Sequence, residues 1–328
     1  MLVMLGTISM LTSLGKNNFR YATAAVFFAI FVFSAQAQDT PNDRVDWALN
    51  AIDNPAQTDT ISEVTTATDQ PHTLFAEDLA RELNNPNSVL ASLTLKNITT
   101  VYDGDLPGAD GQVGNAFEIQ PIFPLPLTAD GACNFYVRPA FTLFMDQPTF
   151  DADRGKFESN FALGDVGFDV AVGQSFDSGM NTVAGMQGTI PVFNELSGGQ
   201  LRLGPEALLA YIDKEGVLAF FPQHQWTVMG NGPDYSSTTL ELIALNFLGG
   251  GRTAGTDSQI SYDWEAVQWT VPINATVKKV VRLGNTPVQL SAVFDYYVEK
   301  NDAFGPDFGI TFSVTPTVPN FIYNAINK

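Results

Sequence analysis

From residue 90 to residue 316, short runs of alternating apolar and polar residues follow one another, separated by Gly, Asn, Asp and Pro. Alternation with period two is typical of a β-strand whose two faces meet different surroundings. In the run 288–299, for example, Phe294 and Tyr296 flank Asp295, whereas the run 236–248 separates its faces poorly. We therefore predict an all-β fold of about twelve strands, with a range of about ten to fourteen. Their ranges are 91–102, 114–125, 134–144, 163–175, 180–192, 200–213, 216–228, 236–248, 257–266, 269–282, 288–299 and 307–314.

The length of these runs separates two all-β architectures. Most cover about 10–14 residues, whereas strands of soluble proteins have a mode of ~5–6 and ~9–11 are needed to cross a bilayer. The polar rows also carry charges in mid-strand, such as Glu118, Arg138 and Lys278. A wet lumen tolerates such charges, so we predict an antiparallel up-and-down transmembrane β-barrel over 90–316. The alternative is a soluble β-sandwich or lipocalin-like protein, with its apolar rows turned inward.

In a barrel, the polar rows line the lumen. A barrel of about twelve strands has a narrow lumen, where we expect facing acids and bases to brace one another and small solutes to pass selectively. A slip of one residue would invert any strand's assignment. The predicted lumen-lining residues are Glu118, Arg138, Asp165, Asp169, Arg202, Glu206, Gln223, Gln225, Lys278, Gln289, Asp295 and Glu299. The predicted aromatic residues at the water–lipid boundary are Trp226, Trp264, Trp269 and Tyr296.

The N-terminal region has the features of a secretory signal peptide. Lys16 and Arg20 precede an apolar run over 21–33, and Ala35-Gln36-Ala37 follows it. This order predicts a signal peptide over 1–37 with cleavage after Ala37. An uncleaved anchor is the alternative, but the apolar run is shorter than the ~20 residues of a spanning helix.

Three further segments flank the predicted barrel. Residues 38–75 are rich in Thr, Asp, Asn, Gln and Pro, and we expect them to be disordered. Leu79 and Leu83 fall on one face of a predicted helix over 76–83, which Asn84-Asn85-Pro86 ends. The segment 76–86 is a candidate plug of the lumen, and 317–328 forms a C-terminal tail.

Charge and composition exclude several classes of function. The chain has 16 basic and 35 acidic residues, a formal charge of −19. Without residues 1–37, 14 basic residues remain against the same 35 acidic ones, a charge of −21. Such a chain is a poor nucleic-acid binder. Cys133 is the single cysteine and there are two histidines, too few for the usual zinc ligand sets, so we expect neither a metal nor another cofactor.

His224 is the only histidine in the strand region. Hydrolases of the outer membrane need a His beside a Ser nucleophile, and on a strand a His-x-Ser spacing puts both side chains on one face. Trp226 occupies that position here, although a Ser from a neighbouring strand stays open as an alternative. Paired carboxylates such as Asp165 and Asp169 have the spacing of lumen-lining residues, so we expect no enzymatic activity.

Several motifs together resemble a known family. In order, they are Leu79-Ala80-Arg81-Glu82-Leu83, Ile119-Gln120-Pro121-Ile122-Phe123-Pro124-Leu125, Gly164-Asp165-Val166, Leu203-Gly204-Pro205-Glu206-Ala207, Gln223-His224-Gln225-Trp226-Thr227-Val228-Met229-Gly230, Trp269-Thr270-Val271-Pro272-Ile273, Gly284-Asn285-Thr286-Pro287-Val288 and Gly305-Pro306-Asp307-Phe308. Over about 76–316, the chain resembles the family of the MetA pathway of phenol degradation, outer-membrane transporter-like proteins. Single motifs of this kind are weak, and their ordered recurrence is more specific.

The resemblance implies an outer-membrane β-barrel of a Gram-negative bacterium that passes small, often hydrophobic or aromatic, solutes by passive diffusion. The family has no agreed catalytic residues to carry over. The expected partners are outer-membrane lipid and the solute, and we expect a monomer. Two alternatives stay open: a closed structural or binding barrel, and an outer-membrane enzyme that modifies lipid.

The predicted processing site can be tested directly. The substitution Ala37→Trp should block cleavage, because signal peptidases require small residues before the cleaved bond. We expect the intact mass of the wild-type protein from membranes to correspond to a chain that begins at Gln38. A wild-type mass that retains residues 1–37 would contradict the prediction.

Overall fold

The computed structural model describes residues 70–284, 286–320 and 322–323. The predicted signal peptide and residues 38–69 of the predicted disordered segment lie outside these residues, as does the end of the predicted tail. Helix α4 spans Gln70–Leu83, so it begins earlier than the sequence predicted, and residues 70–75 are helical rather than disordered. All described residues belong to one compact unit of the chain.

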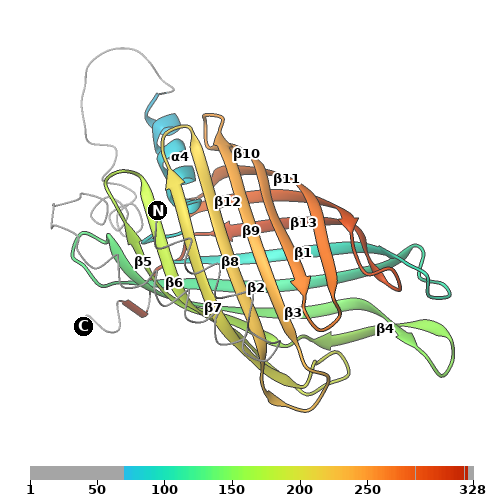
Figure 1. Cartoon of the computed structure of the whole chain (residues 1–328). Helices are drawn as coiled ribbons and strands as arrows, with labels where there is room; N and C mark the ends of the chain where they lie inside the picture. The colour runs from blue at the N-terminus through green and yellow to red at the C-terminus, as the bar shows by residue number, and fades with distance from the viewer. Residues whose placement is uncertain (1–69, 285, 321, 324–328) are drawn as a thin grey trace, which may run out of the picture. The chain divides into compact units, whose positions relative to one another are not determined.

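Thirteen antiparallel strands follow the helix (Figure 1). They are β1 (Ser92–Asp103), β2 (Gln112–Pro126), β3 (Cys133–Asp151), β4 (Lys156–Leu163), β5 (Val166–Ser175), β6 (Met180–Ile190), β7 (Gln200–Ile212), β8 (Gly216–Gly230), β9 (Ser236–Phe247), β10 (Arg252–Asp263), β11 (Gln268–Leu283), β12 (Thr286–Glu299) and β13 (Gly305–Pro316).

The sheet closes on itself. Each strand pairs with its neighbour in sequence, except that β3 pairs with both β4 and β5, and β1 pairs with β13 and with β2. Twelve strands therefore form a closed barrel, and β4 is an extra strand on the distal half of β3. This confirms the predicted up-and-down barrel. A single closed sheet also excludes the sandwich, which requires two sheets.

Two predicted strand ranges need correction. The strand predicted at 257–266 is β10, which starts at Arg252, directly after the turn of Gly249, Gly250 and Gly251. The strand predicted at 134–144 continues in β3 to Asp151 and turns back as β4, which the sequence analysis missed. β4 does alternate, with Phe157, Phe161 and Leu163 opposite Lys156, Glu158 and Asn160, but it covers only 8 residues.

The two ends of the barrel differ. One end, called here the short-turn end, carries the connections 127–132, 176–179, 213–215, 248–251 and 284–285 together with the start of β1 and the end of β13. The other, the long-loop end, carries 104–111, the β3–β4 extension, 191–199, 231–235, 264–267 and 300–304. Lys300 ties part of the long-loop end together, because its ammonium donates to Asp307 at 2.7 Å and to Asp103 at 3.1 Å. Burial lowers the pKa of Lys300, but these two hydrogen bonds outweigh it and raise the pKa above its ordinary value.

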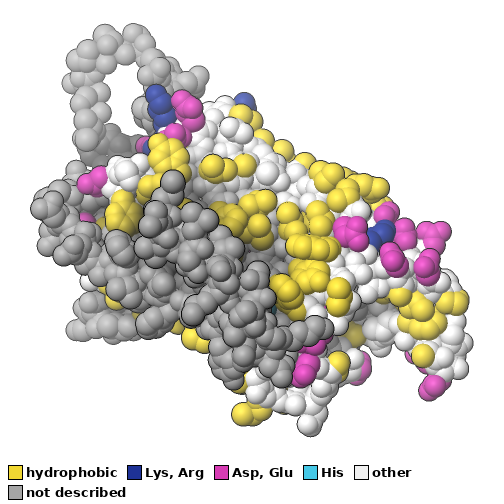
Figure 2. Space-filling view, in the orientation of Figure 1, with side chains coloured by type: hydrophobic (Ala, Val, Ile, Leu, Met, Phe, Trp, Pro, Cys, Tyr) yellow, Lys and Arg dark blue, Asp and Glu magenta, His cyan; other side chains and the backbone are white. Residues whose placement is uncertain are grey.

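The outer wall is apolar. Large hydrophobic side chains are exposed along alternate positions of the strands, among them Ile119, Phe141, Phe161, Met186, Leu209, Leu218, Phe220, Ile273, Val277, Phe294, Ile310 and Phe312. Figure 2 shows hydrophobic side chains gathered over the visible wall, with acidic side chains nearer its ends. A soluble monomer rarely exposes so large an apolar surface, whereas a barrel in lipid requires one. No helix within the described residues is both long and apolar enough to cross a membrane.

The opposite faces of β12 allow a matched test. Phe294 is exposed on the outer wall, while its neighbour Val293 lines the lumen. Phe294→Arg should destabilise the barrel by about 2–4 kcal/mol, the usual cost of a cation on the lipid face near the midplane. Val293→Arg places the same charge in a wet lumen and should cost markedly less. Urea unfolding in lipid vesicles measures both, and equal losses of stability would contradict the assigned faces.

Candidate functional site

The lumen contains a large cavity of about 780 Å³. It is lined mainly by Ser, Thr, Asn, Gln and charged side chains. These come from eleven of the twelve strands of the barrel, and β7 contributes none. Short hydroxyl and amide side chains leave space between the walls. The large cavity therefore forms a polar space that reaches from Tyr297, toward the long-loop end, to Ser92 and Thr315 near the short-turn end.

Charged residues in the lumen pair along the wall. Lys96 Nζ lies 2.7 Å from Glu118 Oε1, and these residues are directly opposite on β1 and β2. Arg138 and Asp169 are likewise opposite on β3 and β5, with Nε and Oδ2 2.5 Å apart. The expected bracing across the lumen is therefore wrong for these pairs, because each joins adjacent strands. This arrangement holds side chains against the wall and keeps the passage open.

The structure places nine of the twelve predicted lumen-lining residues on the two cavities: Glu118, Arg138, Asp169, Glu206, Gln223, Gln225, Lys278, Gln289 and Asp295. Asp165, Arg202 and Glu299 line neither cavity. Asp165 accepts hydrogen bonds from the backbone N–H groups of Val192 and Gly198, which fixes the loop 191–199. The Arg202 guanidinium stacks on Tyr235, 4.0 Å from its ring centroid, and Glu299 is exposed at the rim.

Three charged lumen residues escaped the sequence analysis: Lys96, Glu241 and Asp257. Lys96 belongs to a regular alternation in β1 and could have been found there. Glu241 lies in β9, whose faces were poorly separated in sequence. Asp257 was the first residue of a predicted strand whose start was placed five residues too late. The residues before it were therefore not used to decide which face Asp257 occupies.

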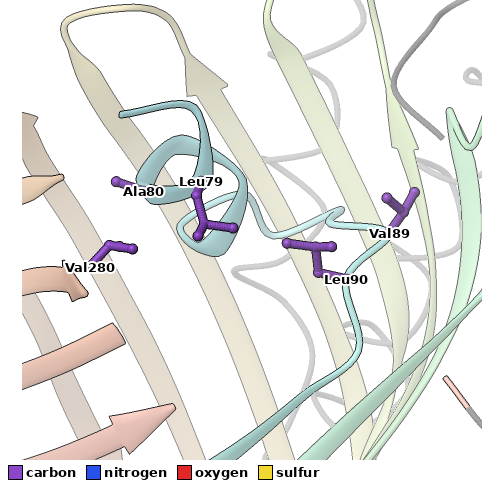
Figure 3. Close-up of a cluster of buried hydrophobic side chains, with 5 residues drawn as sticks. All are labelled: Leu79, Ala80, Val89, Leu90 and Val280. Carbon is purple, nitrogen blue, oxygen red and sulfur yellow. The ribbon is translucent and has the colours of Figure 1, made fainter. Parts of the chain in front are cut away.

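The N-terminal segment, defined here as residues 76–91, lies at the short-turn end of the lumen. Its Leu79, Ala80, Val89 and Leu90 form a buried apolar cluster with Val280 of β11 (Figure 3). Glu77 Oε1 accepts a hydrogen bond from the Gly250 N–H at 2.9 Å, and Lys278 Nζ donates to Asn84 Oδ1 at 3.0 Å. The segment is thus held against the β9–β12 side of the wall.

Asn87 fixes the other side of this segment. It is 2% exposed, and its Nδ2 donates to Ala132 O at 2.8 Å and to Ser175 Oγ at 2.7 Å. Its Oδ1 accepts from Asn134 Nδ2 at 3.0 Å and from the Tyr136 hydroxyl. Gly173 makes room for Asn87, because a Cβ there would lie 2.5 Å from Oδ1. One buried amide therefore links the segment to β3 and β5.

A small cavity of about 290 Å³ lies between the N-terminal segment and the wall of β5–β9. Residues of the segment, including Leu83, Pro86 and Leu90, line it on one side. The small and the large cavity share Arg138, Asp169, Glu241 and Lys278, among other residues. These four residues, called here the charged ring, therefore lie where the two cavities meet.

The predicted boundary aromatics all lie toward the long-loop end, on or beside the outer wall. Trp264, Trp269 and Tyr296 are about half exposed, and Trp226 is partly buried. The Trp264 Nε1 donates to Thr238 Oγ1 at 2.8 Å, and the same hydroxyl lies 2.8 Å from His224 Nδ1. This position suits side chains with an apolar body and a polar tip, and their interfacial role stays a prediction.

Comparisons with known proteins bear on the fold. No family model matches the sequence, and no curated protein matches it. Among solved structures, the chain is similar to an outer membrane channel from Pseudomonas putida F1, with a TM-score of 0.53 and 12% identity over 70% of this chain and 94% of that chain. This likeness supports the fold of an outer-membrane barrel. It leaves the resemblance to the phenol-degradation family unconfirmed.

Two further structures are more distant. The NanC porin has a TM-score of 0.45 and 10% identity, and covers 69% of this chain and 98% of its own. Outer membrane phospholipase A from Escherichia coli has a TM-score of 0.40 and 12% identity, and covers 76% of this chain and 99% of its own. At these values neither likeness bears on activity.

The role of Asn87 can be tested by substitution. Asn87→Ala leaves buried partners unsatisfied, at a cost of ~1–3 kcal/mol for each such group, and should release the N-terminal segment from the wall. We expect trypsin to cleave at Arg81 faster in N87A, while the barrel keeps its heat-dependent shift in gel mobility. Gly173→Ala should have the same effect.

Asn97→Ala is the matched control, because Asn97 makes exposed hydrogen bonds on the outer part of β1. Cleavage at Arg81 that is equally slow in wild type, N87A and N97A would show that Asn87 does not hold the segment.

Proposed function

We propose that this chain is an outer-membrane channel through which small solutes diffuse passively. The observation that carries the proposal is the combination of a closed barrel, an apolar outer wall and a large polar cavity in its lumen. A wall of this kind is stable in lipid, and a wet lumen inside it serves the passage of solutes. The similarity in fold to a solved outer membrane channel supports the proposal.

The two ends of the barrel support an orientation. Outer-membrane barrels place short turns in the periplasm and longer loops outside the cell. The short-turn end, where the N-terminal segment enters, would then face the periplasm. In this orientation the segment acts as a plug behind the charged ring, and solutes enter through the large cavity.

Hydrophobic or aromatic solutes are the class that the family resemblance suggests. The apolar side of the small cavity, which includes Leu208 and Phe221, supports this class, because a purely polar lumen would offer such solutes no contact. The enzyme hypothesis gains no support, since the hydroxyl beside His224 belongs to Thr238 and also accepts a hydrogen bond from Trp264.

Substitutions on opposite faces of β13 test the channel. Thr311 lines the large cavity, and its neighbour Ile310 is on the outer wall. We expect full-length wild-type protein to form discrete conductance steps in planar bilayers and to accelerate the swelling of liposomes in small sugars and amino acids. Thr311→Trp narrows the lumen and should lower both signals, while Ile310→Trp should leave both unchanged.

Wild-type protein that inserts, shows heat-dependent mobility and yet passes neither ions nor solutes would contradict the proposal. N87A then separates two explanations. Conductance that appears only in N87A would assign a gated channel, and its absence there as well would favour a closed structural barrel.

A further inference from the structure

The wall of the small cavity is apolar on one side. Inward-facing residues of β6–β9 form this side, among them Val183, Leu208, Ala219, Phe221, Ile243 and Leu245. Most of them are under 10% exposed and pack together in buried clusters. An inward apolar surface is unexpected in a barrel whose other lumen residues are polar, and it would suit the apolar body of a small molecule.

A buried carboxylate with an unpartnered oxygen lies beside this surface. Glu206 precedes Leu208 on the inner face of β7, is 3% exposed and lines the small cavity. Its Oε2 atom has no hydrogen-bond partner among the described residues. Burying a carboxylate oxygen without a hydrogen-bond partner is costly. A ligand with a positively charged donor would supply that hydrogen bond and so gain binding free energy.

The basic residues of the charged ring are engaged elsewhere. Arg138 pairs with Asp169 at 2.5 Å, and Lys278 contacts Asn84 at 3.0 Å and Asp257 at 3.8 Å. Within the described part of the chain, neither Glu206 nor Glu241 has a Lys or Arg within ion-pair distance. Arg138 and Lys278 also line the small cavity, but both are engaged with other residues, and Oε2 of Glu206 has no hydrogen-bond partner among the described residues.

The chemistry of the cavity narrows the class of ligand. An anion would meet Glu206 and Glu241, and a neutral hydrocarbon would leave Oε2 of Glu206 without a partner. A bare metal ion would lose its water against the apolar wall and find no cluster of three ligating side chains among the described residues. A cation with an apolar body would donate a hydrogen bond to Glu206 and pack against the apolar wall. The volume of about 290 Å³ limits it to a small molecule, at the lower end of ordinary ligand cavities.

We propose that the small cavity binds small organic cations that carry an apolar or aromatic body, such as a primary arylalkylamine. The ammonium donates to Glu206, with Glu241 nearby, and the body packs on Leu208 and Phe221. This inference specifies a class of solute for the proposed channel. It rests on that proposed function, because the solute would reach the small cavity through the large one.

Three probes of equal shape and different charge test this site: benzylammonium, benzyl alcohol and benzoate. Isothermal titration calorimetry of the full-length protein in detergent should show benzylammonium binding more tightly than either of the others. Glu206→Gln should weaken benzylammonium roughly tenfold or more, because a charged hydrogen bond is worth ~1.5–3 kcal/mol. Its effect on benzyl alcohol should be small.

Two further variants complete the experiment. Glu299→Gln is the matched control, since Glu299 is exposed at the rim outside both cavities and its loss should change nothing. Phe221→Leu should weaken benzylammonium while leaving methylammonium unaffected, and it keeps the proposal testable if E206Q fails to fold.

Benzylammonium that binds no more tightly than benzyl alcohol, or that binds wild type and E206Q equally, would overturn the inference. Its failure is distinct from failure of the channel, because calorimetry in detergent does not depend on conductance. Conductance without binding removes the cation site alone, and binding without conductance removes the channel alone.

Discussion

Pairing between β1 and β13 is the contact on which the other features depend, because it joins the first and last strands of the sheet and leaves the ring without an open edge. The register runs from Leu95 opposite Val314 to Asp103 opposite Gly305. In lipid, no water is present to satisfy backbone N–H and C=O groups, so an open edge would be costly. Closure therefore permits an apolar outer wall. Among the strands that the structure describes, β4 ends the sheet order with a free edge, in the extension at the long-loop end.

Closure also gives alternate residues of each strand two different environments, lipid and lumen. Within the lumen, polar side chains line the large cavity, which extends along β10–β13 and β1. Toward the short-turn end, β6–β9 turn apolar residues inward, and the N-terminal segment covers part of that region. An apolar wall facing only water would be unfavourable, so the segment and the wall depend on each other. Asn87 and the cluster around Val280 hold the segment at its two sides.

Much of the fold could be predicted from the sequence, because period-two alternation is strong wherever lipid lies on one side and a polar lumen on the other. β11 and β12 are examples, and Lys278, Gln289 and Asp295 of their predicted polar rows line the large cavity. The signal fails where both faces are apolar. Within β8, Phe220 faces outward and Phe221 inward, so alternation cannot tell them apart. The poor face separation of 236–248 has the same cause, since Ile243 and Leu245 face the lumen.

The ion pairs in the lumen could not be predicted from the sequence for a different reason. Alternation places a side chain on a face, but the partner of each charge depends on strand register. Glu118 meets Lys96 and Asp169 meets Arg138 only because those residues are opposite one another in the ladder. Glu206 lies opposite Gly185 on β6 and Gln223 on β8, neither of which is basic. The same register that pairs Glu118 and Asp169 with bases thus leaves Glu206 outside any ion pair between opposite residues, beside an apolar wall.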